Sequence, residues 1–256
     1  MLEKEEIKRI AEIKGLSVKN TEKDYLLEIT LFVLYNEAGK DLAFKGGTSL
    51  YKLYSLNRFS EDLDFNLVSH KLKINKLFAK VVKKLFDIGI EGKLREIADY
   101  KNQKNIKLEL KGPLFDGNPK NITVVSINIS LKERPIHDLE QRKIFSQYMD
   151  IPAFDVFVMT INELLAEKVR ALLTRDKARD VYDVWFLLNK GAGLNTKDIN
   201  KKLRLYNKIF SKKLFFEKID EKEKSWVADL KSLLIGELPE FDMVKKGIIS
   251  KIIETD

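Results

Sequence analysis

Apolar residues follow two different periods along the first 150 residues of the chain. Spacings of three and four predict helices at residues 3–14, 22–36, 48–54 and 74–89. Alternation of apolar and polar positions predicts strands at residues 58–67, 105–111 and 121–131. From Thr160 onward the helical spacing continues to the end of the sequence. The pattern therefore predicts an α/β domain at residues 1–155, followed by a helical domain at residues 156–256.

The composition limits the chemistry that the chain can support. Of its 256 residues none is cysteine and two are histidine, which excludes thiolate metal sites and argues against an imidazole-based zinc centre. Any bound metal is therefore expected to have oxygen ligands. The longest apolar stretch, residues 29–35, is far shorter than the ~20 residues that span a membrane. Because the charged first residues also lack the apolar core of a signal peptide, we expect a cytoplasmic protein with no membrane partner.

Part of the net charge of +8 lies in residues 200–216, which contain six basic residues and no acid. On a helix, Lys201, Arg204, Lys208 and Lys212 would share one face. Such a stripe is typical either of a solvated lysine face or of a surface that follows a phosphate backbone. The sequence leaves both interpretations open.

Four polar residues alternate in the predicted strand 58–67, namely Arg58, Ser60, Asp62 and Asp64. Side chains at every second position of a strand point the same way, so we expect all four on one face and the apolar residues between them in the core. Two neighbouring carboxylates repel each other, which a protein tolerates at a solvated surface or where a divalent cation neutralises them. This segment alone does not decide between the two.

Two glycines precede this strand, in the order Gly46, Gly47, Thr48, Ser49. Glycine permits unusual backbone torsions and a close approach to a ligand, and we expect Thr48 and Ser49 to cap the helix that follows. The N-terminus of a helix can bind phosphate through its free N–H groups. A phosphate site beside a pair of carboxylates is typical of a nucleoside triphosphate that binds together with Mg²⁺.

A second group of ionisable residues lies in the predicted helix that begins after Thr160. Lys168 falls in the middle of the apolar stripe of this helix, with Arg175 in line below it. A lysine at such a position must either extend to solvent or face an opposite charge, because burial of an unpaired ammonium group is costly. Glu167 and Arg170 are predicted to point away from the stripe into solvent.

Asp180 and Asp183 lie one turn apart in the next predicted helix, on the face that carries Val184 and Leu187. Both carboxylates are therefore expected to point at the protein rather than at water. Acids in a first helical turn also interact favourably with the helix dipole, or cap the helix. A purely structural role for the two aspartates is thus an open alternative to a role in a site.

Two segments of the sequence together resemble the AbiEii family of nucleotidyltransferase-like toxins. They are "FKGGTSLYKLYSLNRFSEDLDF" at residues 44–65 and "AEKVRALLTRDKARDVYDVWFLL" at residues 166–188. The resemblance implies a polymerase-β-like nucleotidyltransferase fold with a helical C-terminal domain, which uses a nucleoside triphosphate and Mg²⁺. Some relatives modify the 3′ acceptor end of transfer RNA, which stops translation and growth. The usual partner is a separately encoded antitoxin protein that also acts as a repressor.

The resemblance also implies roles for individual residues. The catalytic residues would be Asp62, Asp64, Lys168 and Asp180. The metal ligands would be Asp62, Asp64 and Asn128. The nucleotide-binding residues would be Gly46, Gly47, Thr48, Ser49, Arg58, Ser60, Arg175 and Asp183.

Asn128 departs from the pattern of this fold, which usually has a third carboxylate at the corresponding position. An amide oxygen can ligate a metal, but it brings no charge and is a poorer base. Glu109 is either an alternative source of the carboxylate or an ordinary exposed residue of a strand. Three functions therefore stay open: a nucleotidyltransferase toxin that acts on RNA, a nucleotidyltransferase that acts on a small molecule or a protein hydroxyl, and a nucleotide- or RNA-binding protein with weakened catalysis.

Overall fold

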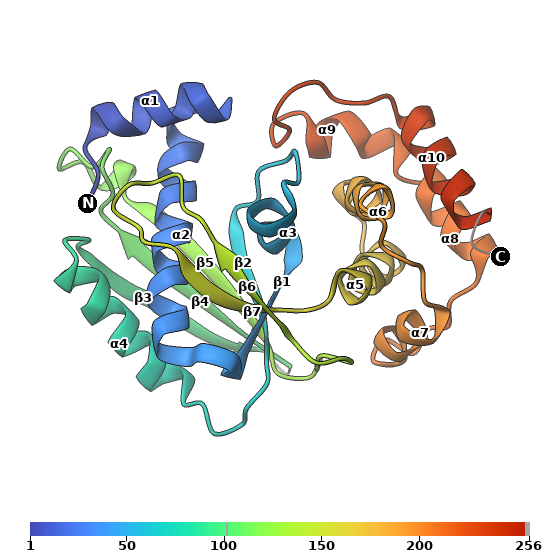
Figure 1. The fold of residues 1–256 in the computed structure, drawn as a ribbon, viewed down its shortest axis with the longest axis horizontal. Helices are drawn as coiled ribbons and strands as arrows, with labels where there is room; N and C mark the ends of the chain where they lie inside the picture. Colours follow the sequence, from blue (N-terminus) through green and yellow to red (C-terminus); the bar gives the residue numbers. More distant parts are fainter. Residues whose placement is uncertain (101, 254–256) are drawn as a thin grey trace. The chain divides into compact units, whose positions relative to one another are not determined.

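The computed structural model describes residues 1–100 and 102–253 and has a mixed α/β fold (Figure 1). The chain forms two compact units. The N-terminal unit consists of Met1–Ser55, Phe59–Pro135 and Leu139–Val158, and the C-terminal unit of Leu56–Arg58, Ile136–Asp138 and the chain from Met159 onward. The last strand of the N-terminal unit thus runs past residue 155, and two short earlier segments belong to the C-terminal unit. No helix in the described part of the chain is long and apolar enough to cross a membrane.

A seven-stranded sheet forms the framework of the N-terminal unit, in the order β3-β4-β5-β2-β1-β7-β6. The strands are β1 (Leu42–Lys45), β2 (Asp62–Leu67), β3 (Gly92–Tyr100), β4 (Gln103–Leu110), β5 (Thr123–Ser130), β6 (Glu140–Ile144) and β7 (Phe154–Val158). The pairs β2/β5 and β1/β7 are parallel, and the other neighbours are antiparallel. Because β1 and β2 are interior strands, neighbours on both sides fix the positions of their residues.

Helices α2 (Val18–Ala38) and α4 (Ile74–Asp87) cover one face of this sheet, and α1 (Lys4–Lys14) packs against α2 (Figure 1). The apolar residues of the strands fill this side. Phe65 of β2, Ile127 of β5 and Ile106 of β4 are fully buried, and the ring of Phe65 contacts that of Tyr35 in α2. The alternate positions of β4 and β5 are half-buried and mostly polar, so they lie on the opposite face of the sheet.

Asp24 of α2 is the centre of a buried ionic cluster that joins α1, α2 and the short helix α3 (Gly46–Tyr54). Its carboxylate lies 2.5 Å from Nζ of Lys14 and 2.6 Å from Nζ of Lys52, and it accepts a hydrogen bond of 2.7 Å from Tyr148. Burial alone would raise the pKa of Asp24, but Lys52 and Lys14 outweigh it and lower the pKa. Since Lys52 belongs to α3, the cluster holds this helix, and with it the glycine turn at its start.

The predicted strand 58–67 is too long, because β2 begins only at Asp62. The other predicted helices and strands of this unit agree with the structure to within four residues at each end. Strands β1, β3, β6 and β7 were not predicted. β3 and β6 are the edge strands, and their sequences, "GKLREIADY" and "EQRKI", are so rich in charged residues that the apolar alternation is weak.

The described part of the C-terminal unit is helical, as the sequence predicts. Its helices are α5 (Ile161–Thr174), α6 (Arg179–Asn189), α7 (Thr196–Arg204), α8 (Lys212–Asp220), α9 (Trp226–Leu230) and α10 (Phe241–Ile253). The predicted basic face at residues 200–216 is wrong. The helix ends at Arg204, Asn207 adopts a positive φ of 54°, and Lys208 donates a hydrogen bond of 2.6 Å to a backbone carbonyl of α5. The six basic residues are therefore not aligned on one helix.

Replacement of Asp24 by asparagine should lower the free energy of unfolding by about 3–5 kcal/mol, because Lys14 would stay buried without its carboxylate and Lys52 would keep only Glu28. Urea denaturation followed by circular dichroism measures the change. Glu5→Gln removes an exposed ion pair with Lys8 in α1 and should have little or no effect. Equal losses in the two variants would contradict the structural role of the cluster.

Candidate functional site

Asp62 and Asp64 lie on the face of β2 that points away from the apolar core. Leu63 between them is fully buried, whereas both aspartates are half-exposed. In the neighbouring strand β5, Ser126 lies opposite Asp62 and Asn128 lies opposite Asp64. The sheet thus places two carboxylates and an amide side by side on one face, and for Asp62 and Asp64 this is what the alternation in the sequence predicts.

Asp64 is held from two sides. Asn128 donates a hydrogen bond of 3.0 Å from Nδ2 to Oδ1 of Asp64. A carboxylate can only accept, so the nitrogen of the amide, and not its oxygen, faces Asp64. On the other side, a Cβ atom at Gly46 would overlap Oδ2 of Asp64, and Gly46 has a φ of +78°, which other residues rarely adopt. Position 46 therefore requires glycine for two independent reasons.

The predicted cap of the following helix is wrong. α3 begins at Gly46, so Thr48 and Ser49 lie inside its first turn. Thr48 donates a hydrogen bond of 2.5 Å to the backbone carbonyl of Asp62, and Ser49 donates one of 2.8 Å to the carbonyl of Gly46. The first bond ties α3 to the start of β2. The N–H groups of the first turn have no acceptor within the helix, and the helix dipole favours an anion in front of them.

The donor set on β2 fits Mg²⁺. This ion binds proteins through one or two carboxylates and completes its octahedral shell with water and phosphate oxygens. Asp62 and Asp64 supply two carboxylates on one face, and the bond from Asn128 fixes the orientation of Asp64. Within residues 1–100 and 102–253 no group of three or more His, Cys, Asp or Glu side chains could hold a metal ion. Phosphate oxygens of a substrate would therefore have to complete the shell.

Glu109 does not replace the missing third carboxylate. It lies opposite Val124 in the ladder between β4 and β5, four residues away from the position of Asn128. Its carboxylate pairs with Lys93 at 3.3 Å and with Arg95 at 3.2 Å, both in β3. Glu109 is thus part of a surface ion pair network rather than of the carboxylate site.

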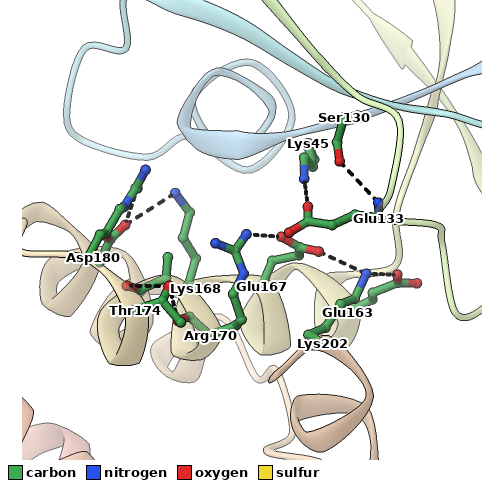
Figure 2. A network of polar contacts seen from close by, with 12 residues as sticks. Lys45, Ser130, Glu133, Glu163, Glu167, Lys168, Arg170, Thr174, Asp180 and Lys202 are labelled. Carbon is green, nitrogen blue, oxygen red and sulfur yellow. Dashed lines mark hydrogen bonds and ion pairs between the residues drawn. The ribbon is translucent and has the colours of Figure 1, made fainter. Parts of the chain in front are cut away.

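Lys45 is a neighbour of the carboxylates that the sequence analysis missed. It lies directly opposite Asp64 in the ladder between β1 and β2. Its ammonium group pairs with Glu133, whose backbone N–H donates a hydrogen bond of 3.1 Å to Ser130 Oγ (Figure 2). The position of Lys45 immediately before the glycine turn could have indicated a role in the site, because phosphate-binding turns commonly have a lysine nearby.

The C-terminal unit contains a second cluster of charged residues. Arg58 donates two hydrogen bonds of 2.6 Å to Asp183, and Arg175 donates two of 2.6 and 2.7 Å to Asp180. Lys168 Nζ lies 3.9 Å from Asp180 (Figure 2). It also lies 2.7 Å from Asp183. Of the two alternatives left open for Lys168, the structure shows the opposite charge rather than extension to solvent. The prediction that both aspartates point into the protein is confirmed, because neither has any exposed surface.

The alternation predicted that Arg58 shares a strand face with Asp62, and this prediction is wrong. Arg58 precedes β2 and belongs to the C-terminal unit, where its backbone forms an isolated β-bridge with Leu234. Ser60 also precedes β2 and is half-exposed. The alternation of apolar and polar residues in the sequence therefore begins before the hydrogen-bonded strand. The sequence alone does not show that the strand starts only at Asp62.

The second cluster contains three cations and two carboxylates, so it carries one positive charge in excess. Burial alone would raise the pKa of Asp183, but the Coulombic attraction of Arg58 and then of Lys168 outweighs it and lowers the pKa to about 2. Asp183 therefore stays ionised at neutral pH. Together the two aspartates hold three basic side chains in fixed positions.

The prediction that Glu167 and Arg170 point into solvent is wrong, because Glu167 is 5% exposed and the side chain of Arg170 is 13% exposed. Glu167 accepts a hydrogen bond of 2.7 Å from Arg170 and lies 2.9 Å from Nζ of Lys202 (Figure 2). Lys202 is itself 3% exposed and lies 2.6 Å from Glu163. A signal for this pairing was present, because Lys202 follows the apolar residue Ile199 by three positions and so shares its helix face.

Comparison with known proteins gives both a family and a fold. The family model described as "Nucleotidyl transferase AbiEii toxin, Type IV TA system" matches residues 33–246. No curated protein sequence matches the chain.

Three solved structures resemble this one over most of its length. JHP933 from Helicobacter pylori has 21% identity and a TM-score of 0.63, and the match covers 94% of this chain and 93% of that one. A putative nucleotidyltransferase from H. pylori has 21% identity and a TM-score of 0.61, with 89% and 92% covered. MenT4, a nucleotidyltransferase toxin from Mycobacterium tuberculosis H37Rv, has 17% identity and a TM-score of 0.66, with 98% and 88% covered. At these identities the likeness concerns the fold, and it confirms the predicted fold class.

Replacement of Gly46 by alanine should lower the free energy of unfolding by more than the strain of a positive φ alone, which is about 1 kcal/mol. The added methyl group would have to displace Asp64. Gly117→Ala is the matched control, because Gly117 also has a positive φ, of +95°, but no atom lies within 4 Å of an added Cβ. Equal losses in urea denaturation would contradict the close contact between Gly46 and Asp64.

Asp183→Asn should be about 3–5 kcal/mol less stable at pH 7, because Arg58 and Lys168 would lose their buried carboxylate. The folded chain lowers the pKa of Asp183, so its contribution is fully present above a pH of roughly 4 and is lost as the pH falls through about 2. The difference in urea denaturation should therefore shrink below roughly pH 4. Asp220→Asn, which breaks an exposed pair with Lys245, is the control. A difference that stays constant down to pH 2 would contradict the assignment.

Proposed function

The chain belongs to the family of AbiEii nucleotidyltransferase toxins, and on this basis we propose that it transfers nucleotides from a nucleoside triphosphate to RNA with Mg²⁺. Family membership makes it a nucleotidyltransferase of a toxin–antitoxin system, with a cognate antitoxin as its implied partner. We assign the acceptor to the 3′ end of transfer RNA, because nucleotides added there would block translation and growth. The supporting observation is the contact of the glycine turn with the carboxylate pair of β2.

The first turn of α3 would bind the triphosphate. Its N–H groups, from Gly46 onward, point out of the helix and carry partial positive charge. Gly46 lacks a side chain, so the phosphates can approach both the backbone and Asp64. Thr48 and Ser49 are engaged with backbone carbonyls, so their hydroxyl groups hold the turn in shape rather than serving as the main phosphate donors.

Asp62 and Asp64 would hold Mg²⁺, which when bound neutralises charge on the transferred phosphoryl group and on the leaving pyrophosphate. Asn128 keeps Asp64 in one orientation through its N–H donor. An amide cannot accept the proton of the attacking hydroxyl group, so of Asp62, Asp64 and Asn128 only the two carboxylates can. Positioning, more than acid–base chemistry, is therefore what these residues contribute.

The charged cluster of the C-terminal unit would supply cations for the phosphates. We assign Lys168 to contact with phosphate or with the charge that develops in the transition state. Asp180 and Asp183 would act as positioning residues, because their carboxylates hold Lys168, Arg175 and Arg58. Direct contact of Asp180 with the metal ion is not needed for this role.

The proposal predicts that purified protein with Mg²⁺, labelled nucleoside triphosphates and total cellular RNA labels a band of the size of transfer RNA. Asp62→Asn and Asp64→Asn should each reduce the label at least a hundredfold, because each removes a carboxylate from the metal site. Glu61→Gln is the matched control, since Glu61 is an exposed neighbour with one distant ion pair at 3.9 Å, and it should keep full activity.

Equal labelling by wild type and Asp62→Asn would contradict the assigned site. Label that enters protein or a small molecule, and not RNA, would contradict the assigned acceptor while leaving the enzyme class intact. The growth inhibition of cells that express each variant should follow the same order as the label in RNA, so cells with the inactive variants should grow best.

A further inference from the structure

A row of three amides extends from Asp64 across the open face of the sheet. Asn128 of β5 lies opposite Asp64, and Asn105 of β4 lies opposite Asn128. Gln103 points to the same face, two residues before Asn105 along β4. We call Asn128, Asn105 and Gln103 the amide row. All three are half-buried, and their strands turn their apolar residues to the opposite side.

Each amide of the row uses one of its two polar atoms within the protein. Asn128 donates from Nδ2 to Asp64, and Gln103 donates from Nε2 to Oδ1 of Asn105. The remaining atoms are Oδ1 of Asn128, Nδ2 of Asn105 and Oε1 of Gln103. None of these three has a hydrogen-bond partner in the described part of the chain. The row thus offers an acceptor, a donor and an acceptor in sequence.

This order of groups is complementary to a base that carries an amino group. An acceptor beside a donor matches N6–H and N7 of adenine, the pairing that asparagine and glutamine make with this base. Cytosine presents a similar amino donor beside a ring acceptor. Guanine and uracil present a carbonyl oxygen at the corresponding position, which would meet the oxygen of Asn128.

An exposed tyrosine lies at the outer end of the row. Tyr100 of β3 is directly opposite Gln103 and is 60% exposed. Aromatic side chains on an open sheet face are the usual stacking platforms for unpaired bases of RNA. Three strand spacings, about 14 Å, separate β2 from β3, so the row and Tyr100 together span about two nucleotides of a single strand.

The side on which the row lies decides which part of the reaction it serves. β2 has β1 with the glycine turn on one side and β5 with the amide row on the other. In phosphoryl transfer the attacking and leaving oxygens lie in line on opposite sides of phosphorus. A triphosphate held by the glycine turn therefore leaves the β5 side for the attacking strand.

We infer that the amide row and Tyr100 bind the single-stranded 3′ end of the acceptor RNA, with a terminal adenine or cytosine on Asn128 and Asn105 and the preceding base stacked on Tyr100. The inference rests on the proposed function, because it takes RNA as the acceptor. It adds a preference for amino-bearing terminal bases, and it assigns Asn105 and Gln103 as specificity-determining residues and Tyr100 as a stacking residue that contributes affinity for any base.

Fluorescence anisotropy with short RNA oligonucleotides that differ only in the 3′ nucleotide tests the inference. The measurement contains EDTA and no nucleoside triphosphate, so it does not depend on catalysis. Wild type should bind ends in adenine or cytosine about tenfold more tightly than ends in guanine or uracil. Asn105→Ala and the isosteric Asn105→Asp should reduce this preference to less than twofold. Tyr100→Ala should weaken the binding of all four oligonucleotides by a similar factor, about tenfold.

Two control variants should bind like wild type. Glu109→Gln changes a residue on the same face of β4, and Phe86→Ala removes an exposed aromatic ring from α4 on the covered face of the sheet. Equal affinity for all four ends in wild type, or an unchanged preference in both Asn105 variants, would overturn the inference. If RNA is labelled in the transfer assay but no oligonucleotide binds, the amide row is not the acceptor site and the proposed function stands. If neither is observed, both fail.

Discussion

The close approach of Gly46 to Asp64 is the contact on which the rest of the candidate site depends. Because the turn has no side chain at this position and adopts a positive φ, α3 can start directly beside the carboxylate. Thr48 then ties the helix to the backbone of Asp62, and the buried cluster around Asp24 holds its far side. One short segment thereby brings the free N–H groups of a helix N-terminus, which suit phosphate, together with carboxylate oxygens, which suit a divalent cation.

Charge is arranged differently in the two units. On β2 the carboxylates are half-exposed, and a neutral amide stands beside Asp64, so a cation can still bind them. In the C-terminal unit, Asp180 and Asp183 are fully buried and carry three basic side chains. Removal of a single member of such a buried cluster leaves a charge without compensation. We therefore regard the first group as the reacting centre and the second as a rigid holder of cations.

The sequence predicts those features that depend on local periodicity. Leu63 and Ile127 are buried while Asp62, Asp64 and Asn128 are not, which follows from alternation along β2 and β5. Features that depend on distant partners were not predictable in this way. The charged edge strands β3 and β6 form only because β4 and β7 are present to pair with them. The pairing of Arg58 with Asp183 joins residues 125 positions apart, and no local pattern encodes it.

A titration with Mn²⁺ followed by electron paramagnetic resonance tests most directly whether the turn and the carboxylate pair form one site. The account predicts weak binding to the protein alone and at least tenfold tighter binding when a nucleoside triphosphate is present, because phosphate oxygens complete the ligand shell. This increase in Mn²⁺ affinity on addition of the nucleoside triphosphate should disappear in Asp64→Asn and persist in Glu109→Gln. An increase of the same size in Asp64→Asn would show that nucleotide and metal ion bind elsewhere and would contradict the account.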